Sequence, residues 1–98
     1  MQMTDQEILD VLKREKPYLR RAFGLLSVGL FGSYVEGAQG PNSDIDLLVE
    51  FAEPSFDSLA GLQIYLEGTF GRPVELIRKR KNLKERFIRR IEKNIRYA

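Results

Sequence analysis

Apolar residues recur at helical spacing near the start, in the middle and at the end of the chain. The pattern predicts one helix over residues 4–16, a second from residue 55 to near Gly68 or Gly71, and a last one that follows Lys81 or Asn82 and includes Ile95. Thr4-Asp5-Gln6-Glu7 is a capping box that begins the first of them, and Gly24 is a stop signal. Pro17 either interrupts this helix or opens a following one. In the last helix, Ile88, Ile91 and Ile95 are expected to face the core.

Three short apolar runs, at residues 26–31, 44–51 and 73–77, predict strands. The first run is apolar at successive positions, so we expect helices to cover both of its faces. The fold class is therefore α/β (α+β), with a small mixed β-sheet of three to four strands flanked by helices. A length of 98 residues fits one domain over residues 1–98.

Composition narrows the chemistry that this chain can perform. Cysteine and histidine are both absent, which excludes disulfides, thiolate zinc sites, cysteine nucleophiles and histidine bases. Acid–base and metal chemistry must therefore use carboxylates. The first ten residues lack a signal-peptide pattern and no apolar run could span a bilayer, so we expect a cytoplasmic protein with no membrane contact.

Charge is distributed unevenly along the chain. Residues 72–98 hold 11 Lys and Arg but three acids, although the whole chain has a net charge of only +2. A basic face of this kind binds either nucleic acid or an acidic protein partner. Because the last helix needs an apolar stripe for the core, we assign most of these charges to its solvated face and do not expect nucleic acid as the main partner.

Asp44 and Asp46 open the second predicted strand. Residues i and i+2 of a strand point to one face, about 6.6 Å apart, so the two carboxylates project together. Oxygen ligands favour hard cations, first Mg²⁺ and also Mn²⁺, and two such ions can clamp the oxygens of a phosphoryl transfer. Glu75, a polar residue in an apolar strand, is the candidate third carboxylate or general base. Alternatively, it is an edge residue paired with Arg72 or Arg78.

Gly32-Ser33 follows the first predicted strand, and ten residues separate it from Asp44. A glycine lets a phosphate approach the main chain, and a serine at a helix start offers a hydroxyl and free amides. An ordinary turn capped by serine is the alternative. The two motifs together, at adjacent strand ends, predict a site for a nucleoside triphosphate and its metal ions.

The segment LFGSYVEGAQGPNSDIDLLVEF resembles the signature of minimal nucleotidyltransferases in the DNA polymerase beta superfamily, and the similarity extends over nearly the whole chain. The resemblance implies the nucleotidyltransferase fold. It also implies that Gly32 and Ser33 bind the nucleotide, and that Asp44, Asp46 and Glu75 are catalytic and bind two Mg²⁺ ions. Two departures stand out: Glu75 occupies a position usually held by Asp, and Tyr34 stands where many relatives have Arg.

The family resemblance further implies transfer of AMP from ATP, or of another nucleotide from its triphosphate, to a hydroxyl. Many similar proteins are antitoxins that adenylylate a tyrosine of a helical HEPN toxin, so we expect such a partner and a hetero-oligomer. Two alternatives remain open. The two departures favour a catalytically weak member that neutralises its partner by binding alone, and the basic C-terminal region favours a nucleic-acid-binding module.

Overall fold

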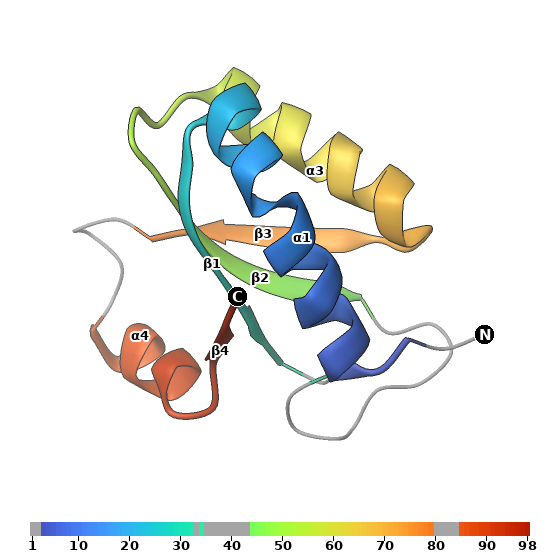
Figure 1. Ribbon diagram of the computed structural model, residues 1–98. Helices are drawn as coiled ribbons and strands as arrows, with labels where there is room; N and C mark the ends of the chain where they lie inside the picture. Colours follow the sequence, from blue (N-terminus) through green and yellow to red (C-terminus); the bar gives the residue numbers. More distant parts are fainter. Residues whose placement is uncertain (1–2, 33, 35–43, 80–84) are drawn as a thin grey trace.

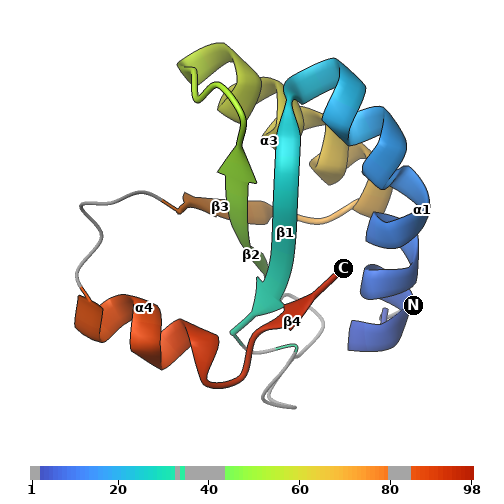
Figure 2. The same ribbon diagram turned by 60° about the vertical axis from the view of Figure 1, so that its left-hand side comes forward.

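The computed structural model describes residues 3–32, 34, 44–79 and 85–98. Its helices are α1 (Asp5–Phe23), α3 (Phe56–Phe70) and α4 (Glu85–Glu92). Its strands are β1 (Leu25–Phe31), β2 (Ile45–Phe51), β3 (Val74–Arg78) and β4 (Arg96–Tyr97). Helices α1 and α3 lie together against one face of the sheet, and α4 lies near the far end of β1, beside β4 (Figures 1 and 2).

The sheet has the strand order β3-β2-β1-β4. β1 is antiparallel to both β2 and β4. β2 and β3 are parallel to each other, and helix α3 lies in the segment that connects them. The sheet is therefore mixed and four-stranded, and the predicted fold class is confirmed. The parallel pair matters most for function, because it places the beginnings of β2 and β3 at the same edge of the sheet.

Helix α1 is one continuous element, although the sequence allowed a break at Pro17. Thr4 and Glu7 form the predicted capping box, and Gly24 ends the helix with φ of 74°. Leu12 and Leu19, seven residues apart, are both fully buried and anchor the helix on either side of the proline. Pro17 itself is exposed, so its ring projects into solvent while packing of the opposite face maintains the helix.

The main core lies between the sheet and the two helices α1 and α3. Ile45, Leu47 and Val49 of β2 alternate toward it, with Leu62 and Leu66 of α3 opposite. The ring of Tyr65 packs near Tyr18 and Phe23, which joins α1 to α3. Among the described helices, none is long and apolar enough to cross a membrane.

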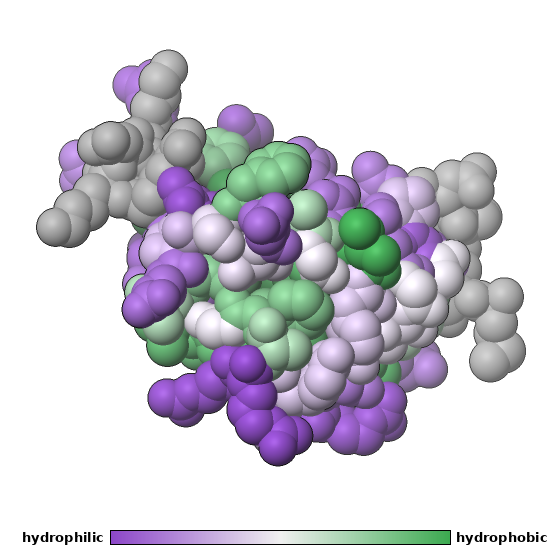
Figure 3. All heavy atoms as spheres, turned by 90° about the horizontal axis from the view of Figure 1, so that it is seen from above, coloured by the Kyte–Doolittle hydropathy of each residue, from purple (hydrophilic) through white to green (hydrophobic). Residues whose placement is uncertain are grey.

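Several large apolar side chains are exposed. Leu26 is 43% exposed, so helices do not cover both faces of β1 along its whole length. On α3, Phe56 is 82% and Ile64 72% exposed, because they lie on the side of the helix away from the sheet. Figure 3, in which the molecule is seen from above, shows apolar side chains on this surface, bordered by hydrophilic ones.

The C-terminal segment differs from the expected single helix. α4 ends at Glu92, and the chain then turns into β4, which pairs with β1 at Gly29 and Leu30. Ile95 is therefore not on a helix face as predicted. It packs over Gly29, where an added Cβ would come within 2.5 Å of its side chain. The missing side chain of Gly29 thus creates the space in which this segment docks; the predicted helix start at residue 82 lies outside the described residues.

Candidate active site

Asp46 and Glu75 lie side by side on neighbouring strands. In the parallel register of β2 and β3, their Cα atoms are direct partners, so both side chains project from the same face of the sheet. Ile45, one residue earlier, points the other way and is fully buried in the main core. The carboxylates thus stand on the sheet face opposite α1 and α3, close enough for Glu75 to change the pKa of Asp46.

This contact changes the acidity of Asp46. Partial burial, the hydrogen bond to Glu75 and the negative charges of Glu75 and Asp44 raise the pKa of Asp46 from its ordinary value of 3.8 to about 6. Burial is the largest cause, because it disfavours the charged form, and the neighbouring carboxylates add to it. A carboxylate whose pKa is raised by burial and by neighbouring negative charges marks a candidate functional site.

Gly32 brings the main chain against this pair. Its φ is +79°, which L side chains rarely adopt. A Cβ built at this position would lie 3.1 Å from Cγ of Asp46 and closer still to Oδ2. No other residue type could occupy the position without displacing the Asp46 carboxyl, so the glycine allows the main chain to lie directly beside this carboxyl. The predicted approach of a phosphate to Gly32 stays a prediction.

The other predicted site residues are only partly placed. Asp44 directly precedes β2, is exposed, and acts on Asp46 through its charge. Ser33 lies outside the described residues. Within residues 3–32, 34, 44–79 and 85–98, no three carboxylates lie close enough together to form a complete metal-ligand group. The structure therefore brings Asp46 and Glu75 together and leaves Asp44 nearby, but does not gather all three.

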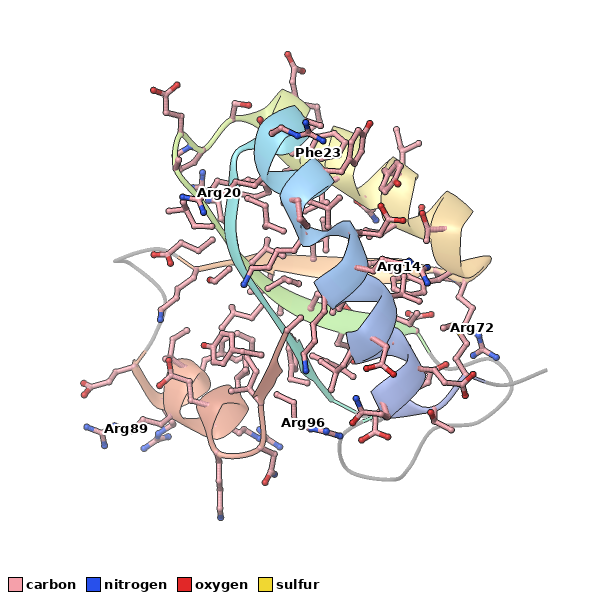
Figure 4. All side chains as sticks on the ribbon, viewed as in Figure 1. Arg14, Arg20, Phe23, Arg72, Arg89 and Arg96 are labelled. Carbon is pink, nitrogen blue, oxygen red and sulfur yellow. The ribbon has the colours of Figure 1, made fainter. Side chains whose placement is uncertain are left out.

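Tyr34 and Arg72 form a polar contact that the sequence did not reveal. Tyr34 is only 2% exposed and belongs to the main core, and its hydroxyl accepts a hydrogen bond of 2.6 Å from Nη1 of Arg72. Arg72 lies just before β3, three residues from Glu75, and Figure 4 shows its side chain at the outer edge of the molecule. In the sequence, Arg72 directly precedes the predicted strand 73–77, and this position was the feature that could have indicated a positive charge near the start of β3.

A donor set of carboxylate oxygens suits a hard divalent cation. Asp46 and Glu75 would supply oxygens from adjacent strands, and Asp44 a third from the same end of β2. The close pair fits this use, because a bound cation would offset the repulsion between two neighbouring carboxylates. The arrangement is suited to chemistry on phosphate groups, whose negative charge a metal ion neutralises.

Comparison with known proteins gives a consistent result. Residues 7–98 match the family model described as nucleotidyltransferase domain. The protein adenylyltransferase MntA of Thermococcus cleftensis is 42% identical over 78 residues, which cover 79% of each chain.

Solved structures agree on the fold. A structure described as a minimal nucleotidyltransferase has a TM-score of 0.77, is 28% identical, and matches over 98% of both chains. A complex of a tri-AMPylated HEPN toxin with its MNT antitoxin, from Shewanella oneidensis, has a TM-score of 0.62 and 18% identity, over 91% of this chain and 70% of the other. Together with the family match over residues 7–98, these likenesses show that the chain belongs to the nucleotidyltransferase domain family and is an enzyme of that class.

Proposed function

We propose that this protein is a Mg²⁺-dependent protein adenylyltransferase of the cytoplasm, which transfers AMP from ATP to a tyrosine of a helical HEPN toxin and so acts as its antitoxin. The observation that carries the proposal is the Asp46–Glu75 pair beside the backbone of Gly32. The 42% identical relative is named a protein adenylyltransferase, and the Shewanella complex joins an AMPylated HEPN toxin to an MNT antitoxin. Both support the choice of donor and acceptor.

In the proposed reaction, the tyrosine oxygen attacks the α-phosphorus of ATP. The new bond joins that oxygen to AMP, the bond to the β-phosphate oxygen breaks, and pyrophosphate leaves with the electron pair. Asp44, Asp46 and Glu75 would hold Mg²⁺, which neutralises the charge of the triphosphate. Gly32, whose backbone lies beside the Asp46 carboxyl, and Ser33 are proposed to bind the phosphates next to these carboxylates.

The tyrosine proton needs an acceptor near the reacting atoms. A carboxylate within reach of the hydroxyl can act as its general base. We assign proton acceptance to Glu75, which is exposed and lies beside Asp46 on the neighbouring strand.

Transfer of label from α-³²P-ATP tests the function directly. The chain is incubated with Mg²⁺, labelled ATP and the HEPN toxin encoded beside it, and the toxin is examined for label. We expect labelling that stops with EDTA, returns with Mg²⁺ or Mn²⁺, and is lost in Asp46→Asn. Glu53→Gln, an exposed carboxylate change after β2, is the matched control and should transfer normally.

The same assay separates the alternatives. A toxin that is inhibited without acquiring label would show neutralisation by binding alone. This alternative is supported by the described residues, in which no three carboxylates form a metal-ligand group. The described contacts of the basic region argue against a primary role in nucleic-acid binding. Lys79, Arg89 and Arg96 are each within ion-pair distance of an acid, and Figure 4 shows Arg89 at α4, apart from Arg96 of β4.

A further inference from the structure

A hollow of about 200 Å³ lies between the end of β1 and helix α4. α4 approaches the sheet at this end of β1, as Figure 2 shows. The residues that line the hollow come from the end of β1, from α4 and from the turn that follows α4: Phe31, Gly32, Phe87, Arg90, Ile91 and Asn94. The proposed reaction as described above does not use this space.

The hollow adjoins the carboxyl pair. Gly32, which lines it, is the residue whose backbone lies against the Asp46 carboxyl. Phe31 is the Cα partner of Asp46 across the antiparallel β1–β2 pair, so both side chains rise from the same face of the sheet. A molecule that reaches the carboxylates can therefore place a neighbouring part in the hollow.

The walls suit a flat aromatic ring with polar edges. Phe31, Phe87 and Ile91 supply apolar surface, and Phe87 is 38% exposed although it is a large aromatic residue. Asn94 contributes an amide that both donates and accepts hydrogen bonds, the pattern that pairs with adenine. Arg90 adds a positive charge that is in no ion pair with any residue the structure describes.

The size of the hollow restricts the occupant to part of a ligand. Pockets for whole drug-sized ligands have volumes of roughly 300–1,000 Å³, so about 200 Å³ suits one ring system whose remainder lies outside. If a nucleotide binds with its phosphates at Gly32 and the carboxylates, its base is the ring system that would occupy the hollow. A tyrosine ring of the acceptor would use the apolar walls, but its single hydroxyl does not need an amide with both a donor and an acceptor.

We propose that this hollow is the nucleobase subsite, in which adenine stacks on Phe87 and Phe31 and is selected by Asn94. The inference rests on the proposed transfer of AMP from ATP and adds to it the residues that choose the base. Base stacking on an aromatic side chain is worth enough to change affinity about tenfold or more. We therefore expect Phe87→Ala to weaken ATP binding by about that factor without affecting the triphosphate contacts.

Competition binding on the full chain tests the proposal. Ribose-labelled fluorescent ATP is bound in Mg²⁺ and displaced by ATP, GTP, CTP, UTP or inorganic tripolyphosphate. Wild-type protein should prefer ATP among the nucleotides. Phe87→Ala should lower the affinity for ATP about tenfold, and Asn94→Ala should reduce the preference for ATP over GTP, while both bind tripolyphosphate as the wild type does. Phe56→Ala, an exposed phenylalanine of α3, and Arg89→Ala, outside the hollow on α4, are the matched controls.

The outcomes separate the two proposals. Equal competition by all four nucleotides, unchanged in Phe87→Ala and Asn94→Ala, would overturn the base subsite and leave nucleotidyl transfer standing. If Phe87→Ala and Asn94→Ala raise only the KM for the toxin and leave the nucleotide affinities unchanged, the hollow binds the acceptor, and the proposal is also overturned. If neither nucleotides nor tripolyphosphate bind, the proposed function fails, and the base subsite fails with it.

Discussion

Asp46→Asn is expected to stabilise the protein while abolishing its activity. The substitution removes a carboxyl group that the fold holds beside Glu75 and near Asp44, and it keeps the size of the side chain. An asparagine amide can donate a hydrogen bond to the Glu75 carboxylate without adding negative charge. The variant therefore replaces repulsion between two acids with an ordinary hydrogen bond.

The magnitude follows from the pKa of Asp46. A rise from 3.8 to about 6 corresponds to a cost of at most about 3 kcal/mol for the ionised form, at 1.36 kcal/mol per pKa unit. Because the side chain is only partly buried, solvent screening reduces this cost, and we expect about 1–2 kcal/mol. In a domain of this size, such a change raises Tm by at least about 4 °C.

The sign of the pH dependence is determined by the same values. The folded state holds the proton of Asp46 up to about pH 6, whereas the unfolded chain loses it near pH 3.8. Stability from this group therefore falls as pH rises from about 4 to 6 and stays low above that. The advantage of Asp46→Asn should be full at pH 8 and disappear near pH 4.

Urea unfolding followed by circular dichroism at pH 8, 6 and 4.5, without divalent ions, measures this advantage. Glu53→Gln removes the same charge from an exposed position and should change stability little at each pH. With Mg²⁺ at pH 8 the stability advantage of Asp46→Asn over the wild type should shrink, because an ion that binds only the folded wild type stabilises it by mass action. An Asp46→Asn variant that is no more stable at pH 8, or equally favoured at pH 8 and 4.5, would refute the reasoning.

Three further substitutions test how the fold supports the site. Tyr34→Phe removes the acceptor for Arg72 and should cost about 0.5–1.5 kcal/mol in urea unfolding; an unchanged midpoint would show that the buried hydroxyl contributes nothing. Gly29→Ala should cost about 1–3 kcal/mol by forcing Ile95 away from β1, with faster amide exchange in β4; unaltered exchange would contradict this packing. Thr4→Ala should lower stability by about 1 kcal/mol, and an unchanged Tm would show that the capping box is dispensable.

Local features of the chain were predictable from sequence because they depend on neighbouring residues. The capping box at Thr4 satisfies backbone donors within one turn, and Gly24 ends α1 through its own φ of 74°. The alternation of a strand makes Asp46 point away from the side that buries Ile45. The phosphate and metal site that the spacing of Gly32 from Asp44 and Asp46 predicts is different in kind, because it stays a prediction that the proposed assays test.

Tertiary structure alone decided which distant residues meet. The parallel register of β2 and β3 places Glu75 beside Asp46, and no local pattern specifies that register, because it arises from cross-strand hydrogen bonds and from packing against α3. Packing likewise turned Ile95 from an expected helix face onto Gly29, and left Phe56 in solvent although its residue type favours the core. Sequence determined which groups were available for chemistry, and long-range packing determined which of them share a site.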